Sequence, residues 1–321
     1  MRQILFSACI LGFALLACKK EIAPEEPSVV SDKKIAVQFN VSDFLRQQEV
    51  LPTPGGRKYQ TAQGRDSLLS EKVSNVYYFA FEKSSGNKVH LKHQTPANSG
   101  LNFGLIKDTL LPGSYTILMV ASIDSLRIIS DGEIMGSGPE LGTLRASYNW
   151  DNQDFLYPLK DQFFKKFDLI VPSSGEVPQA NISLDRYMSK IEVRVNDAAA
   201  LEADNKDIEV IAFGAHNNFH YNSASPSWGG LNLRFSKSSG NTYTAYALPS
   251  AAPHYEVKVI VKERGTGTVL NTKVIPNVTA TKNKATILSG NALSVTPTEE
   301  KPEWHIQLNV IWEASSPVID F

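Results

Sequence analysis

The sequence contains very little cysteine, with two residues among 321, and none follows Cys18. Neither a disulfide between distant strands nor a thiolate metal site can therefore be built in the body of the chain. Charge of one sign is missing as well, since 33 Asp and Glu face 32 Lys and Arg. A nearly neutral chain has no long-range field that recruits nucleic acid, so we expect no nucleic-acid partner.

Local catalytic patterns are also absent. The sequence has no zinc-protease helix motif, redox dithiol, serine-hydrolase elbow, P-loop or EF-hand loop. We therefore expect no enzyme, no cofactor and no metal. Because Asp and Glu are scattered along the chain, a carboxylate pair assembled by the fold in a hydrolase stays an alternative.

Long apolar runs are rare, and the clearest one is at the N-terminus. Residues 4–17 carry no charge and follow a single cation, Arg2. At about 14 residues the run is too short to cross a bilayer of about 30 Å, and it matches the apolar region of a signal peptide. The sequence Leu15-Leu16-Ala17-Cys18 resembles a bacterial lipobox. We therefore predict that residues 1–17 are a lipoprotein signal peptide and that Cys18 carries lipid; a plain secretory signal with an incidental cysteine is the alternative.

The next segment, residues 18–33, changes character at once. It is charged and interrupted by Pro24 and Pro27, so it cannot bury enough apolar surface to fold. We predict a flexible tether that links the folded body to the outer membrane through lipid at Cys18. Several acyl chains are enough for stable anchoring.

Beyond the tether, apolar residues recur with a period of two, which is typical of β-strands with one buried face. Residues 35–41 are one such strand, with an apolar face made of Ile35, Val37, Phe39 and Val41. Residues 75–81 and 115–121 are apolar on both faces, which indicates strands inside a sandwich. Residues 159–169 fit a short helix or an edge strand, and both alternatives stay open. Further strands are predicted at 188–195, 208–213, 243–248, 255–261 and 269–275.

The length of the chain and one segment rich in proline and glycine suggest two domains. Residues 171–178 hold two prolines and several small polar residues, which oppose both helix and strand ladder. We place a linker there, with one domain over 34–175 and another over 176–321. The many short strands favour an all-β protein of two β-sandwich domains in tandem.

The last strong strand, residues 304–312, alternates without a break. Its apolar face consists of Trp304, Ile306, Leu308, Val310 and Trp312. A face of this kind needs an apolar partner surface.

Two sets of side chains could bind a ligand. His216 and His220 have the spacing of two ligands on a helix, but the residues between them indicate a loop or strand end, and His90 and His93 lack a third ligand nearby. We interpret both pairs as surface histidines. The aromatic pairs Trp150 with Tyr148, and Trp228 with Tyr221, could stack on sugar rings. The simpler interpretation, which we favour, is that these aromatics cap the ends of sandwiches.

Four segments together resemble the fimbrillin superfamily of Bacteroidota, the subunits and anchors of their type V pili. They occur in the expected order across about 215 residues. The segments are 76–81, the turn Leu111-Pro112-Gly113-Ser114-Tyr115-Thr116, residues 184–193 with Arg186 and Lys190, and the strand Asn283-Lys284-Ala285-Thr286-Ile287-Leu288-Ser289-Gly290.

The resemblance implies two β-sandwiches of transthyretin-like or Greek-key type and a function without catalysis. It also implies assembly by strand complementation, in which a protease removes the first strand and a neighbour's C-terminal segment fills the groove. On this chain the first strand is 35–41, and candidate cleavage sites after it are Arg46, Arg57 and Arg65. The candidate donor strand is 304–312. Anchor subunits of the family are expected to keep both lipid and first strand.

We therefore predict a structural fimbrial subunit at the outer membrane surface that supports adhesion. An anchor or accessory role is favoured, with other fimbrial subunits as partners by strand exchange. The alternative is a surface glycan-binding lipoprotein of a polysaccharide uptake system, in which Trp150 or Trp228 stacks on sugars.

Overall fold

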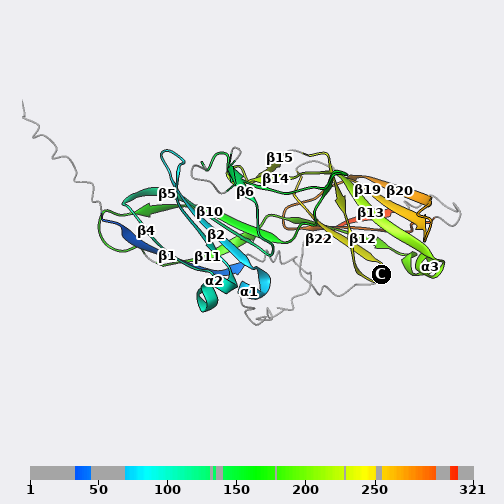
Figure 1. Cartoon of the computed structure of the whole chain (residues 1–321), viewed down its shortest axis with the longest axis horizontal. Coiled ribbons are helices and arrows are strands. Elements are labelled where there is room, and N and C mark those ends of the chain that lie inside the picture. The colour runs from blue at the N-terminus through cyan, green and yellow to red at the C-terminus, as the bar shows by residue number, and fades with distance from the viewer. Residues whose placement is uncertain are drawn as a thin grey trace, which may run out of the picture.

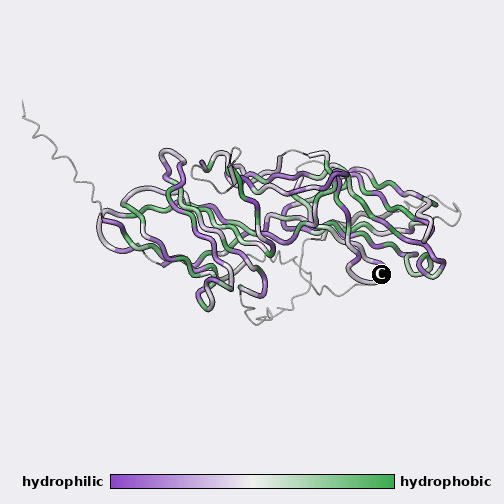
Figure 2. The backbone as a smooth tube through the Cα atoms, in the orientation of Figure 1, coloured by the Kyte–Doolittle hydropathy of each residue, from purple (hydrophilic) through white to green (hydrophobic). Residues whose placement is uncertain are grey.

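A computed structural model describes residues 33–44, 69–130, 133–134, 140–177, 179–227, 229–250, 255–293 and 304–309. Over these residues the chain is built mainly of β-strands, as the period-two alternation predicts, and it is drawn out along one axis (Figure 1). Apolar and polar residues alternate along many of the strands (Figure 2). The helices among them are short: α1 (Leu69–Lys72), α2 (Pro96–Ser99), η1 (Gly100–Asn102) and α3 (Ala198–Ala203).

One half of the molecule is a seven-stranded sheet with the order β3-β2-β5-β10-β11-β1-β4. The sheet folds over, so that side chains of β3 at one end contact β4 at the other. Its strands are β1 (Ile35–Phe44), β2 (Asn75–Glu82), β3 (Lys88–Gln94), β4 (Leu105–Leu110), β5 (Gly113–Ser122), β10 (Gln162–Val171) and β11 (Ala180–Arg186).

The central strands of this sheet are buried on both faces, as their continuous apolar sequences predict. In β2, every residue except Glu82 is buried. Tyr78 and its face of the sheet pack on an inner core that includes Val37, Phe39 and Leu184. Tyr77 and the opposite face join a larger core that continues into the other half of the chain.

A small five-stranded sheet, β15-β14-β8-β6-β7, supplies part of that larger core. It combines strands from both halves of the sequence, because β14 pairs with β8. Leu126, Ile128, Ala146 and Phe219 from this region are buried together with Tyr77. The strands are β6 (Ile128–Ser130), β7 (Glu133–Ile134), β8 (Arg145–Ser147), β14 (Asn218–His220) and β15 (Ser225–Ser227).

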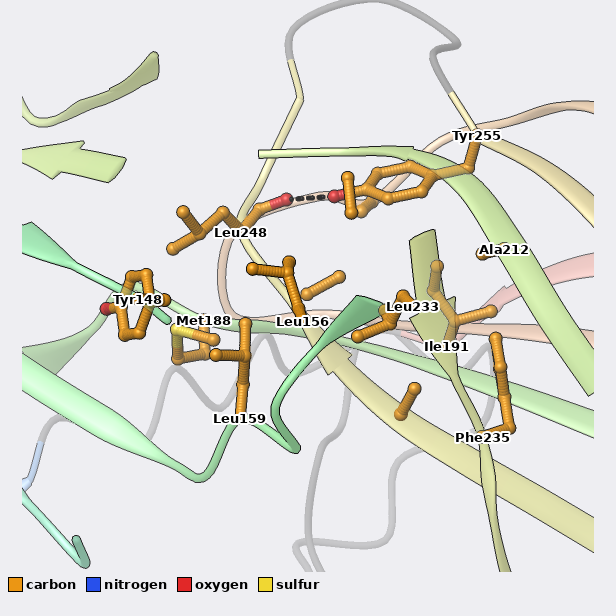
Figure 3. Packing of buried hydrophobic residues seen from close by; sticks show 14 of the residues in the cluster. Tyr148, Leu156, Leu159, Met188, Ile191, Ala212, Leu233, Phe235, Leu248 and Tyr255 are labelled. Atoms are coloured by element: carbon orange, nitrogen blue, oxygen red, sulfur yellow. Dashed lines mark hydrogen bonds between the residues drawn. The ribbon is translucent and has the colours of Figure 1, made fainter. Parts of the chain in front are cut away.

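Two further five-stranded sheets form the other half of the molecule, with orders β17-β18-β12-β21-β22 and β20-β19-β13-β16-β9. Ile191, Leu233, Phe235 and Tyr255 pack together in their common core (Figure 3). The first sheet contains β12 (Ser189–Val195), β17 (Ser236–Ser239), β18 (Thr242–Ala247), β21 (Ala285–Gly290) and β22 (Trp304–Asn309). The second contains β9 (Phe155–Leu156), β13 (Lys206–Ala215), β16 (Leu231–Arg234), β19 (Tyr255–Glu263) and β20 (Val269–Val278).

The segment interpreted as a linker lies between β10 and β11, which both belong to the seven-stranded sheet. β11 ends at Arg186, and the next strand, β12, begins at Ser189 in another sheet. In addition, β9 pairs with β16 of the second half. The division at residues 175 and 176 stays a prediction. For residues 159–169, the structure selects a strand, but the expected edge position is wrong, because most of this segment lies in β10, which pairs with β5 on one side and β11 on the other.

The junction between the halves is held by a buried polar cluster. The hydroxyl of Tyr148 donates to Gln162 Oε1 at 2.6 Å, and the hydroxyl of Tyr187 donates to the same oxygen. The two hydroxyl oxygens lie 3.1 Å apart. Burial raises the pKa of both tyrosines, so both hydroxyls stay protonated donors. The ring of Tyr187 stacks on Phe219 with centroids 4.2 Å apart.

We expect Gln162→Leu to lower the free energy of unfolding by about 2 to 4 kcal/mol, because it leaves buried hydroxyls without their common acceptor. Tyr148→Phe removes one donor and keeps the other bond, so its cost is about 1 kcal/mol. Tyr157→Phe, on an exposed ring, is the control and changes stability by less than about 0.5 kcal/mol. Urea unfolding measures all three, and equal values for the two buried variants would contradict the shared-acceptor explanation.

Candidate functional site

Strand β1 is held by main-chain pairing on both sides. It runs parallel to β11, with Phe39 opposite Ala180, and antiparallel to β4, with Val37 opposite Asp108. Among the described strands, β11 and β4 have no ladder to each other, so β1 alone connects them. We call the space that β1 fills, between β11 and β4, the β1 slot.

The inward side chains of β1 are the apolar set expected from the sequence. Val37 is 2% exposed and Phe39 is 1% exposed, and both belong to the inner core with Ile35 and Val41. The Phe39 ring lies 5.8 Å from that of Tyr78. On the other face, polar side chains pair across the strands: Gln38 Nε2 donates to Gln179 Oε1 at 2.8 Å, and Asn40 Nδ2 donates to Asn181 Oδ1 at 3.3 Å.

The magnitude of this burial shows why the β1 slot must be filled. Full burial of a large apolar side chain contributes about 1.5 to 3 kcal/mol. Four such side chains therefore contribute an amount comparable with the whole net stability of a domain, about 5 to 15 kcal/mol. Without β1, the slot would need another strand with apolar residues at every second position.

A glycine at the start of β4 sets how closely the two strands approach. Gly104 has φ +89°, and its carbonyl accepts a hydrogen bond from the Val41 main-chain N at 2.9 Å. A Cβ at this position would lie 2.5 Å from Leu69 Cδ2 and 3.0 Å from the Val41 carbonyl oxygen. Positive φ and close backbone contact both require glycine here.

The candidate donor strand has a different environment from β1. Trp304, Ile306 and Leu308 lie in β22, which pairs antiparallel with β21 and is the last strand of its sheet in the described chain. β22 therefore has a main-chain neighbour on one side only. Val310 and Trp312 lie outside the described residues, as do Cys18, Arg46, Arg57 and Arg65.

Sequence reasoning missed an ionic cluster where the ends of the seven-stranded sheet meet. Asp108 on β4 has a side chain only 4% exposed. Its Oδ2 lies 2.6 Å from His90 Nδ1, and its Oδ1 lies 3.1 Å from Lys92 Nζ. Burial raises the pKa of this carboxyl, but hydrogen bonds from His90, Lys92 and the Thr109 N–H outweigh it, and the net pKa falls below its usual value.

The sequence did contain a signal for this cluster. Asp108 lies between Ile106 and Leu110 on the same face of one strand, so a charged residue interrupts an apolar stripe. Such a residue must find buried partners. Its partners on β3 are 16 and 18 positions away in the sequence, which is why local patterns did not identify them.

Comparison with known proteins decides the family. The profile of the fimbrillin-A associated anchor proteins Mfa1 and Mfa2 matches residues 52–296, more than half of the chain. The chain belongs to this family. A search of curated proteins finds no match. The family is one of structural proteins of fimbriae, which are not enzymes, so the predicted fimbrial role is confirmed at this level.

Solved structures resemble this fimbrial protein in fold. A candidate adhesin from Bacteroides ovatus aligns with a TM-score of 0.52 and 10% identity, over 80% of this chain and 90% of that one. A candidate polysaccharide-binding protein from Bacteroides thetaiotaomicron aligns with a TM-score of 0.52 and 12% identity, over 88% and 98%. The fimbrial anchor protein Mfa2 from Porphyromonas gingivalis aligns with a TM-score of 0.44 and 14% identity, over 80% and 91%.

Three of the histidines considered as metal ligands contact different side chains, and His90 contacts Asp108 as described above. His220 Nε2 lies 2.7 Å from Ser227 Oγ, and His93 Nε2 lies 2.9 Å from Asn75 Oδ1. Within the described part of the chain, no three His, Cys, Asp or Glu side chains are grouped as metal ligands. The described helices include none with the length and apolar character needed to cross a membrane.

The aromatic pairs proposed for sugar stacking do not lie together at the surface. Tyr148 and Tyr221 are buried, 8% and 0% exposed. Trp150 is 40% exposed, whereas Trp228 lies outside the described residues. A sugar site on Trp150 stays a prediction.

The low pKa of Asp108 makes stability depend on pH. A carboxyl with a depressed folded pKa contributes fully above its unfolded pKa, about 4, and loses that contribution as pH falls through the folded pKa. We expect Asp108→Asn to cost about 2 kcal/mol at pH 7 and to flatten the decline of stability between pH 5 and 2. Urea unfolding across that range measures both effects, and an unchanged slope would contradict the assignment.

Proposed function

We propose that this fimbrial protein is a lipid-anchored anchor or accessory subunit that keeps its first strand and joins a fibre through its last. The match to an anchor-protein family carries the proposal, and the filled β1 slot supports it. Lipid at Cys18, followed by the tether of residues 18–33, would hold the half that contains β1 against the outer membrane.

The position of β1 relates anchoring to assembly. Arg46, Arg57 and Arg65 all lie between β1 and α1 in the sequence, so cleavage at any of them would separate β1 and the lipid from the rest of the chain. A chain that is not cut keeps its slot closed and cannot accept a donor strand there. Such a molecule would end a fibre, which is the property required of an anchor.

Pairing geometry supports β22 as the strand that is given to a neighbour. Among the described strands of its own sheet, β22 pairs only with β21, whereas a strand in the β1 slot pairs with both β11 and β4. Moving to an open slot of another subunit would therefore gain a second ladder of main-chain hydrogen bonds. The alternation of Trp304, Ile306 and Leu308 matches the spacing of the inward residues Val37 and Phe39.

We expect Cys18→Ser to move the protein from the membrane fraction to the soluble fraction, because the thioether can no longer form. Cys9→Ser is the matched control and leaves the protein in the membrane. N-terminal analysis of protein from purified fibres gives the second measurement. A lipidated Cys18 supports an anchor, while a start directly after Arg46, Arg57 or Arg65 would contradict it.

For strand donation, we expect Ile306→Asp with Leu308→Asp to reduce incorporation into fibres by about tenfold or more, since a carboxylate cannot enter an apolar slot. The matched control is His305→Asp with Gln307→Asp, which places the same charges on the other face of the strand. Quantitative blotting of purified fibres measures incorporation, and urea unfolding checks that both variants are folded. Equal incorporation of the two variants would exclude donation by this strand.

A further inference from the structure

The two end strands of the seven-stranded sheet face each other without a main-chain ladder. Among the described strands, β3 pairs only with β2, and β4 pairs only with β1. We call the boundary between them the β3–β4 seam. Free strand edges are templates for pairing with another chain, so this seam is a hazard in a protein that exchanges strands.

Side chains of β3 form hydrogen bonds with three main-chain groups at the edge of β4 that faces the seam. Gln94 Nε2 donates to the Leu105 carbonyl oxygen at 2.9 Å, and Gln94 Oε1 accepts from the Gly104 N–H at 2.9 Å. Lys92 Nζ donates to the Lys107 carbonyl oxygen. The carbonyls of two alternate residues of β4, which face away from β1, are therefore already bonded.

Asp108 completes the same arrangement from the β4 side. Its carboxylate lies 2.6 Å from His90 Nδ1 and pairs with Lys92 at 3.1 Å, which holds the Lys92 side chain across the seam. We call Lys92, Gln94 and Asp108 the latch.

The seam is open to solvent, so packing alone does not protect it. Hollows of about 570 Å³ and about 710 Å³ lie along it, and Lys92 and Lys107 line both. An extended segment could reach the strand edges if the latch side chains moved aside. Since Gln94 and Lys92 already bond the Leu105 and Lys107 carbonyls, an incoming strand must displace these side chains and the half-buried Lys92–Asp108 ion pair before it can bond there.

We propose that the latch determines where strands can exchange, because it keeps the strands of other molecules out of the β3–β4 seam. The seam is then removed from the strand edges at which two molecules could pair. The inference rests on the proposed function only where it names the donor strand of another molecule as the strand that is kept out. The protection of the open edge does not depend on the proposed function.

The test uses the full chain with Cys18→Ser, which cannot be lipidated. The latch variant carries Lys92→Val and Gln94→Val. The control variant carries Lys107→Val and Thr109→Val, which makes the same change of charge and adds two valines on the exposed side of β4. Light scattering during size-exclusion chromatography measures self-association over a range of concentrations, and hydrogen exchange follows the amides of Leu105 and Lys107.

We expect the latch variant to associate at about tenfold lower concentration than the control, with the Leu105 and Lys107 amides protected in the associated form. The control should behave as the parent chain does. Equal self-association of the two variants would overturn the proposal. If a urea titration shows that the latch variant does not fold, Lys92→Met replaces it, because methionine keeps the apolar stem and loses the donor. This variant should also associate at a lower concentration than the control.

A synthetic peptide of residues 304–312 is the second probe. It should leave the Leu105 and Lys107 amides of the parent chain unchanged and protect them in the latch variant. Protection in the parent chain would also overturn the proposal, because the seam would then be an acceptor site. Failure of strand donation in fibres would leave the self-association result intact, so the two proposals fail separately.

Discussion

The structure depends on the pairing of β1 with two strands that have no ladder to each other. β11 and β4 come from distant parts of the sequence, and β1 completes the sheet between them. The same strand inserts Val37 and Phe39 into the inner core. Main-chain bonding on both sides and apolar burial underneath act together, so loss of this strand would remove a large part of the stability of that half.

The open strand edges of the molecule are protected from pairing by different kinds of residue. The β1 slot is filled by an apolar strand, and the β3–β4 seam is bridged by polar side chains. β17, an end strand of another sheet, is short and fully exposed, with three serines and a lysine. β22, an end strand of its sheet in the described chain, carries the alternating apolar residues Trp304, Ile306 and Leu308, and the proposed donation rests on this combination.

The two halves of the chain are joined more tightly than a short linker would allow. β9 and β14 each pair with a strand from the other half, and the Tyr148, Gln162 and Tyr187 cluster is buried between them. β1 and β22 lie in different halves (Figure 1). In the proposed arrangement, with lipid at Cys18 and a neighbour bound through β22, a load would pass through this junction, where hydrogen bonds and stacked rings oppose separation.

The sequence by itself determined the properties that depend on near neighbours along the chain. The alternation in 35–41 and the continuous apolar runs at 75–81 and 115–121 predicted strands and their buried faces, because side chains in a strand alternate with period two. Residues 171–178 show the limit, since their prolines and glycine predicted a break in regular structure but did not indicate that β10 and β11 on either side belong to one sheet. Only the tertiary structure decided that Asp108 meets His90 and Lys92, and that Gln94 bonds to β4. Those contacts exist because the seven-stranded sheet folds over until β3 and β4 at its two ends meet. The order in which the strands pair cannot be predicted from local sequence patterns, because the paired strands are far apart in the chain.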